Sequence, residues 1–145
     1  MNKTSRFFGL LIFIYIFGCA SPNTESRSDE QCFAIEFCIN EMLKKITADY
    51  VFIGTDTPAI ENCAMKFLGA RFTTERPKVV DGAYFVDGRP ALMLYLAREP
   101  DKFNTMRFSV FRAVGPLAGH GEIFEFRKIN GKWEFYSREL SGALS

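Results

Sequence analysis

The stretch Phe124-Glu-Phe-Arg-Lys-Ile-Asn-Gly-Lys-Trp-Glu-Phe135 determines the C-terminal part of the fold. Asn130-Gly131 is the strongest short signal for a two-residue hairpin turn. With these two residues in the turn, the flanking strands pair as Phe126 with Phe135, Arg127 with Glu134 and Glu125 with Tyr136. A slip of one residue would separate the aromatic pair and the oppositely charged pair, so the side chains set the register. The segment therefore predicts an antiparallel hairpin.

Alternating apolar residues upstream of this hairpin predict further strands. We expect a turn at Asp87–Pro90, with Pro90 in the loop because it cannot donate a ladder hydrogen bond. The glycine-rich tract Gly115–Gly121 is expected to be a flexible connection into the hairpin, since a phosphate-binding loop would lead into a helix. The expected strands are Val79–Val86, Ala91–Leu96 and Thr105–Val114.

Two helices are predicted before the strands, from apolar residues at three- and four-residue steps. Ser28–Gln31 has the spacing of a capping box ahead of the first helix. The second begins at Thr57-Pro58 and ends before Gly69. Between them Tyr50–Ile53 is apolar, and its pattern leaves open a buried linker or a short extended segment. The apolar positions are Cys32, Ile35, Ile39, Met42, Leu43 and Ile46, then Ile60, Cys63, Ala64, Phe67 and Leu68.

These elements predict a single α+β domain over residues 30–145. Two N-terminal helices pack on one face of a meandering antiparallel sheet of about five strands. This order of elements, closed by a hairpin that contains Trp133, resembles the NTF2-like (cystatin-like) superfamily, whose members form a cone. The tract Gly115–Gly121 with that hairpin and Leu144-Ser145 is similar to small uncharacterised lipoproteins of Gram-negative bacteria. That short resemblance implies no known activity.

The N-terminus has the pattern of an export signal. Lys3 and Arg6 precede Phe7–Phe17, which holds no charged residue and is shorter than the ~20 apolar residues that span a bilayer. We therefore expect a signal peptide over residues 1–18 that is removed. Ile16-Phe17-Gly18-Cys19 resembles the lipobox of bacterial lipoproteins, although Phe17 is larger than the usual residue there.

That resemblance implies that Cys19 becomes the lipidated first residue, carrying palmitate or similar acyl chains as a membrane anchor. Residues 19–29 are then the lipidated cysteine and a flexible tether, since they hold no large apolar side chain. Ala20 after the cysteine favours the outer membrane, facing the periplasm, over the inner membrane. The alternative is an ordinary secreted protein whose apolar segment happens to end near a cysteine.

Composition and charge narrow the function classes. The chain has 145 residues, 48% of them hydrophobic, and a formal net charge of +1, which fits one globular domain and not a disordered chain. Removal of residues 1–18 takes away Lys3 and Arg6, so 16 basic residues face 17 acidic ones and the net charge becomes −1. A near-neutral surface argues against binding of nucleic acid.

Three cysteines remain after Cys19, in a compartment that we expect to be oxidising. Cys32 and Cys38 lie on one helix, separated by a rise of about 9 Å that a disulfide does not bridge. If the two helices form an antiparallel hairpin, Cys38 is level with Cys63, so we expect that pair to be bridged and Cys32 to be a buried thiol. Pairing of Cys32 with Cys63, or no bridge at all, stays open. No two cysteines have the C-x-x-C spacing of a redox site.

We expect no catalytic residue, metal ion or cofactor. His120 is the single histidine, and we expect Glu122, the nearest carboxylate, to point to the other face of the strand. One histidine and buried cysteines do not make a zinc site. An NTF2-like cone would keep a pocket between helices and sheet, although the same aromatic residues are also typical of a core. The residues that would line such a pocket are Tyr84, Phe108, Phe126, Trp133, Phe135 and Tyr136.

The sequence therefore predicts a lipid-anchored envelope protein that is not an enzyme. We expect it to bind a partner protein or a small apolar ligand through its α+β domain. Two alternatives remain open: an enzyme that uses an NTF2-like pocket, and a periplasmic immunity or inhibitor lipoprotein. The second would use an exposed loop, for which Glu99–Asn104 and Gly115–Gly121 are the candidates.

Overall fold

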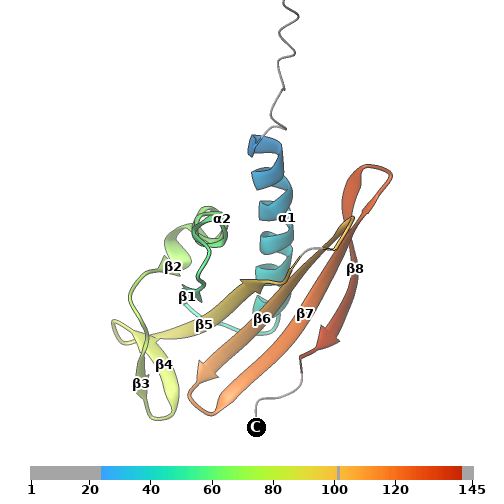
Figure 1. The fold of residues 1–145 in the computed structure, drawn as a ribbon. Coiled ribbons are helices and arrows are strands. Elements are labelled where there is room, and N and C mark those ends of the chain that lie inside the picture. Colours follow the sequence, from blue (N-terminus) through green and yellow to red (C-terminus); the bar gives the residue numbers. More distant parts are fainter. Residues whose placement is uncertain (1–23, 101, 142–145) are drawn as a thin grey trace, which may run out of the picture.

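The computed structural model describes residues 24–100 and 102–141, and it shows an α+β fold (Figure 1). The expected signal peptide, residues 1–18, and Cys19 lie outside the described residues. The helix α1 begins at Thr24, inside the range that was expected to be a tether. The elements are α1 Thr24–Leu43, β1 Tyr50–Gly54, α2 Pro58–Leu68, a 3-10 turn Gly69–Arg71, β2 Phe72–Thr73, β3 Lys78–Val80, β4 Ala83–Val86, β5 Arg89–Arg98, β6 Thr105–Gly115, β7 Ala118–Ile129 and β8 Lys132–Leu140.

The sheet is mixed, with β1 running parallel to both of its neighbours. Its main path is β2-β1-β5-β6-β7-β8, and β3 and β4 add a hairpin at the start of β5. The expected order of two helices followed by about five antiparallel strands is therefore wrong, because β1 lies between the helices and the described sheet has eight strands. The sequence of Tyr50–Ile53 does not alternate between apolar and polar residues, because one face of β1 is buried and the other, with Tyr50 and Phe52, is half-buried.

The C-terminal hairpin forms with the expected turn. Asn130 and Gly131 both have positive φ, and β7 and β8 pair Phe126 with Phe135 and Arg127 with Glu134. The expected pairing of Glu125 with Tyr136 is wrong, because a bulge shifts the register there and places Ser137 opposite Glu125. An extra residue in one strand is the usual form of such a bulge. It reverses the faces of the side chains from Ser137 to Leu140 relative to an unbroken strand.

Two expected features of the middle strands also differ in the structure. The expected strand Val79–Val86 is a hairpin, since Asp81 and Gly82 take positive φ and turn β3 into β4. Asp87 and Gly88 form a second tight turn, so Pro90 pairs with Phe85 at the sheet margin rather than lying in the loop.

The tract Gly115–Gly121 is not a flexible loop. Its turn is short, because Gly115 already pairs with Ala118 across Pro116-Leu117. Gly119 and Gly121 lie within β7 and pair with Ala113 and Phe111 of β6. The glycines of this tract are therefore strand residues, and they serve the packing of neighbouring side chains.

Both helices pack on one face of the sheet. The helix α2 begins at Pro58 and ends at Leu68, as the sequence predicts, with Ile60, Cys63 and Ala64 buried. The helix α1 buries Ala34, Ile35, Cys38, Ile39 and Met42 in the core, against alternate residues of the strands. At its C-terminal end, Arg112 of β6 donates a hydrogen bond to the Met42 carbonyl over 2.9 Å, which satisfies one of the carbonyls that a helix end leaves free.

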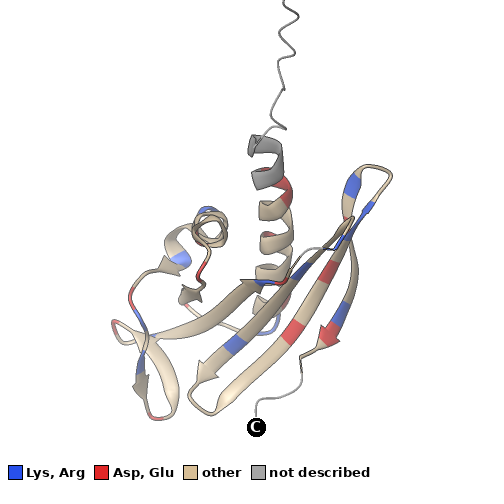
Figure 2. Ribbon diagram, viewed as in Figure 1, with Lys and Arg blue, Asp and Glu red and all other residues tan. Residues whose placement is uncertain are grey.

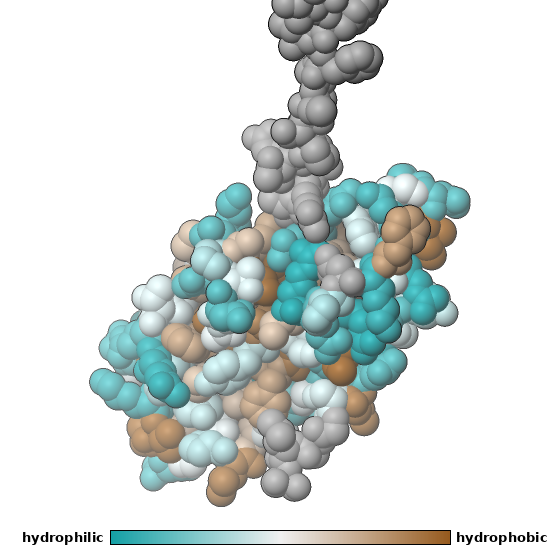
Figure 3. All heavy atoms as spheres, in the orientation of Figure 1, coloured by the Kyte–Doolittle hydropathy of each residue, from teal (hydrophilic) through white to brown (hydrophobic). Residues whose placement is uncertain are grey.

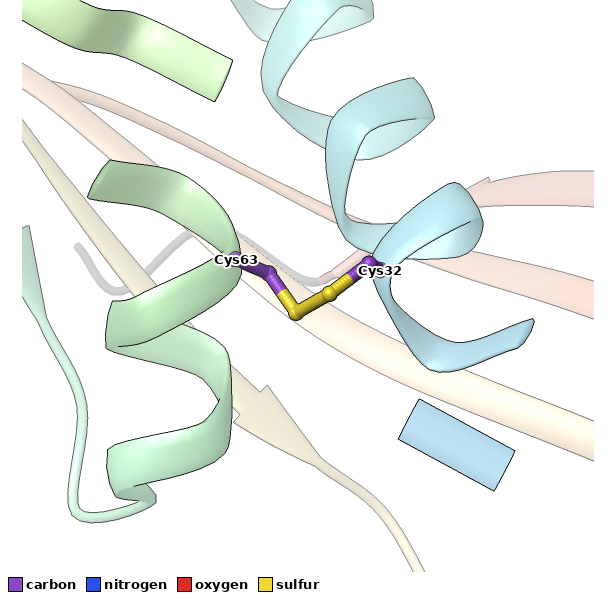
Figure 4. The surroundings of a disulfide bond; sticks show 2 residues. All are labelled: Cys32 and Cys63. Atoms are coloured by element: carbon purple, nitrogen blue, oxygen red, sulfur yellow. A yellow bond between two sulfur atoms is a disulfide. The ribbon is translucent and has the colours of Figure 1, made fainter. Parts of the chain in front are cut away.

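A disulfide joins the two helices, but it is not the expected one. Cys32 of α1 bonds Cys63 of α2 with a Cα–Cα distance of 5.2 Å (Figure 4), while Cys38 is free and wholly buried. The expected pair Cys38–Cys63 is wrong because the helices do not form a simple hairpin. Residues six apart on a helix also point about 120° away from each other. Because Cys38 points to the sheet, Cys32 points to α2.

Candidate functional site

The space between the helices and the sheet, where a pocket was expected, is packed with aromatic side chains. Phe108 and Phe126 are wholly buried in the core. Phe135 stacks on Phe37 of α1 with ring centroids 4.7 Å apart. Phe37 also meets Phe124 and Phe126 edge to face. Phe108, Phe124 and Phe126 are core residues, and the partly exposed rings of Phe37 and Phe135 pack against them, so these side chains leave no ligand pocket between them.

The other residues expected in that pocket lie apart from one another. Tyr84 is half-buried in the β3–β4 hairpin. Tyr136 lies at the β8 bulge, with the Arg127 guanidinium 3.3 Å from its ring centroid. Trp133 donates a hydrogen bond from its indole Nε1 to Glu30 of α1 over 2.6 Å and borders a small hollow of about 230 Å³ with Glu30 and Lys128.

The Glu30 carboxylate links the N-terminal half of α1 to the C-terminal hairpin. It accepts the Trp133 bond and a second bond from Lys128 Nζ over 3.1 Å. These two hydrogen bonds, the Trp133 bond first, hold the pKa of Glu30 below its ordinary value, because they favour the charged form.

A larger hollow, of about 500 Å³, lies on the sheet face that points away from the helices. In β5 the residues Leu92, Leu94 and Leu96 enter the core, so Tyr95 and Ala97 point to the opposite face. Across the strands Tyr95 pairs with Phe111 and Ala97 with Ser109. We call this feature the Tyr95–Phe111 hollow. Its lining residues are Gly54, Thr55, Asp56, Tyr95, Leu96, Ala97, Ser109, Val110, Phe111 and Ser141.

Glycines on the strands that flank β5 and β6 make room for the two rings of this hollow. A Cβ at Gly54 would lie 2.5 Å from Tyr95 Cδ1, and one at Gly119 would lie 2.2 Å from Phe111 Cζ. Contacts this short do not occur between carbon atoms, so each ring leans into space that only glycine leaves free. Tyr95 leans toward β1 and Phe111 toward β7, and the small pair Ala97 and Ser109 forms the floor beside them.

Polar groups border the hollow on two sides. Asp56, at the entry to α2, is exposed and accepts a hydrogen bond from the Thr57 hydroxyl over 3.1 Å. The Ser109 hydroxyl donates to Glu99 over 2.6 Å. Ser141 lines the side nearest β7, where its N–H donates to the Gly121 carbonyl. The hollow therefore combines two aromatic walls with a few fixed polar groups, which is the usual composition of a ligand site.

An ionic network borders Glu99 on the same sheet face. The Arg107 guanidinium lies 3.3 Å from Glu99, 3.9 Å from Glu125 and 3.9 Å from Glu139. Figure 2 shows the mixed signs of charge along β6, β7 and β8. Because three carboxylates share the positive charge of Arg107, this residue offers little positive charge to a ligand.

His120 and Glu122 meet, contrary to the expectation that they would diverge. They are two residues apart on β7, and such residues point to the same face of a strand. Their side chains lie 2.8 Å apart, and Arg138 lies 3.6 Å from the other Glu122 oxygen. Burial raises the pKa of the nearby Cys38 thiol above its ordinary value, which disfavours the reactive thiolate while the side chain stays buried. The arrangement is an ion-pair cluster at the end of α1.

Sequence reasoning missed Tyr95 and Phe111, the residues that make the hollow. A signal for them exists in the period-two pattern, because each follows a core position of its strand by one residue. The pattern does not show which strand lies next to Tyr95. The pairing of Gly54 with Tyr95 depends on β1, which the sequence does not identify as a strand.

Comparisons with known proteins give no relative. No protein family, no curated protein and no solved structure matches this chain. Within residues 24–100 and 102–141, no helix has the length and apolar character to cross a bilayer. In the same part of the chain, no group of three or more His, Cys, Asp or Glu side chains is arranged to hold a metal ion.

Proposed function

We propose that this chain is a lipid-anchored binding protein of the cell envelope that holds a small ligand in the Tyr95–Phe111 hollow. The observation that carries the proposal is the pair of rings displaced over glycines beside an open volume of about 500 Å³. A volume of this size accommodates a small organic molecule, and the two rings offer it an apolar contact. The ligand's apolar part rests between Tyr95 and Phe111.

A dye titration tests the binding site. N-phenyl-1-naphthylamine, a neutral dye that fluoresces in apolar surroundings, is added to the wild-type chain and to Ala97→Leu. Ala97 is exposed on the hollow floor, so leucine there fills the site without entering the core. We expect at least tenfold weaker binding. Leu117→Ala is the control, because Leu117 is fully exposed and outside the hollow. Equal binding by wild type and Ala97→Leu would refute the site.

The anchor is a separate part of the proposal. It rests on the lipobox-like Ile16-Phe17-Gly18-Cys19 and on the apolar segment before it. The lipid would hold the domain on the periplasmic side of the outer membrane. Metabolic labelling with a fatty-acid analogue is expected in the wild type and lost in Cys19→Ser. Labelling that persists in Cys19→Ser would contradict the anchor.

We also propose that the fold is a variant of the NTF2-like architecture. Two helices that precede most of the sheet, together with a closing hairpin that contains Trp133, support this. In this variant the space under the helices is core, and the ligand site moves to the outer sheet face. The polar side chains on the helix side of the sheet that could serve the enzyme alternative, His120 and Glu122, contact each other at the end of α1 and lie outside the Tyr95–Phe111 hollow.

A second function, binding of a partner protein, is favoured by exposed apolar residues at both ends of the sheet. Leu117 is fully exposed at the β6–β7 turn and Phe103 is 93% exposed at the β5–β6 turn. Figure 3 shows brown groups at the lower edge of the molecule and at its upper right, separated by teal. Immunity or inhibitor lipoproteins would use such tips. Photo-crosslinking from position 117 in cells tests this: a discrete product supports it, and its absence contradicts it.

A further inference from the structure

We infer that the ligand of the Tyr95–Phe111 hollow is an amine, with a positive charge next to a flat apolar body. This inference rests on the proposed function, since it names the class of molecule that the same hollow would take. It follows from three properties of the lining: the sign of its charge, the direction of its hydrogen bonds and the nature of its walls.

The charge of the lining is negative. Among the ten residues that line the hollow, Asp56 is the one acidic residue and none is Lys or Arg. The carboxylate of Asp56 is exposed, and its contact is with the uncharged Thr57 hydroxyl. It is therefore free to pair with a cation from a ligand. An anion would meet this carboxylate without a compensating basic side chain.

Two polar groups of the lining, Ser109 and Asp56, offer acceptors to a ligand. The hydroxyl hydrogen of Ser109 is directed to Glu99, so the Ser109 oxygen presents its lone pairs to the hollow. Asp56 accepts hydrogen bonds only, when ionised. The residue after Thr57 is Pro58, which has no N–H, so the start of α2 offers one donor fewer to an anion. An ammonium group supplies the donors that these acceptors need.

The aromatic walls of the hollow also favour an amine with a flat apolar body. Tyr95 leans toward β1, the strand that leads into Asp56, so the aromatic ring and the carboxylate border one side of the hollow. The face of a tyrosine ring attracts a cation within about 6 Å. Phe111 leans toward β7 on the other side and offers an apolar contact for the ligand's body. The ammonium group would thus lie between Asp56 and Tyr95, with the body against Phe111.

Three matched probes test the inference on the full chain: 1-naphthylmethylamine, 1-naphthylmethanol and 1-naphthylacetate, which are cationic, neutral and anionic at pH 7. Affinities are measured by calorimetry or by NMR titration. We expect the amine to bind at least tenfold more tightly than the alcohol, and the acetate most weakly. Asp56→Asn should remove that tenfold preference and leave the affinity for the alcohol within twofold.

Asp87→Asn is the matched control, because Asp87 is an exposed turn residue outside the hollow with a positive φ that asparagine tolerates. It should keep the preference for the amine. If alcohol and amine bind the wild type equally, or Asp56→Asn keeps the preference, the inference is overturned while the proposed function stands. If none of the three probes binds, the proposed function falls and the inference with it.

Discussion

The disulfide between the helices gives a sharp test of the structure. A Cys32–Cys63 bond and a Cys38–Cys63 bond predict opposite responses to reductant in variants that lack Cys32 or Cys38. The structure joins Cys32 to Cys63 and leaves Cys38 as a free thiol. The perturbation is removal of the bridge by reductant, compared in the wild type, in Cys32→Ala and in Cys38→Ala.

The magnitude follows from the length of chain that the bridge closes. The two cysteines are 31 residues apart, and the chain-entropy relation for a loop of this length gives about 3.7 kcal/mol. Domains of this size are stable by about 5–15 kcal/mol, so reduction removes a large share of the stability. With a urea dependence of about 1.5 kcal/mol per molar, the unfolding midpoint should fall by roughly 2 to 3 M.

Urea unfolding followed by circular dichroism, with and without reductant, measures this effect. The wild type and Cys38→Ala are expected to lose about 3.7 kcal/mol on reduction, whereas Cys32→Ala should show no response to reductant. A response that persists in Cys32→Ala and vanishes in Cys38→Ala would mean that Cys38 is bridged, and the placement of α1 against α2 would be wrong.

Two further changes test the packing of α1. Phe37→Ala removes the ring that stacks on Phe135 and meets Phe124 and Phe126. It should lower the free energy of unfolding by about 3 kcal/mol, measured by chemical unfolding. The control Phe67→Ala, at an exposed position, should lower it by under about 1 kcal/mol, and equal losses would contradict the packing. Because hydrogen bonds from Trp133 and Lys128 lower the pKa of folded Glu30, its charge stabilises the fold above the ordinary pKa, and this contribution is lost as pH falls through the lowered one. The stability difference between wild type and Glu30→Gln should therefore shrink between pH 7 and about pH 3, and a difference that grows on acidification would contradict the contact.

Local sequence signals predicted the elements whose contacts are close along the chain. The Asn130-Gly131 turn sets the pairing of Phe126 with Phe135, and Pro58 and Gly69 mark the ends of α2. In each case the residues that determine the structure lie within a few positions of the element itself. The same signals do not report a bulge, since the shift at Glu125 depends on how β8 continues along the sheet.

The features that were missed depend on contacts between distant segments. Tyr50–Ile53 becomes a strand because it pairs with Ala91–Leu94 about forty residues on, and an isolated apolar run does not reveal its partner. The disulfide was misplaced for the same reason, since the choice between Cys32 and Cys38 depends on how α1 is rotated over the sheet. The hollow requires both the unpredicted β1 and the leaning of Tyr95 over Gly54.

The buried Cys38 thiol makes the domain a reporter of its own opening. It is wholly shielded from solvent and its pKa is raised by burial, while Cys32 and Cys63 are occupied by their bond. An alkylating reagent can react only with a thiolate that it reaches. The rate at which Cys38 is alkylated therefore measures how often α1 lifts from the sheet. The alkylation rate needs no added label and can be measured by mass spectrometry.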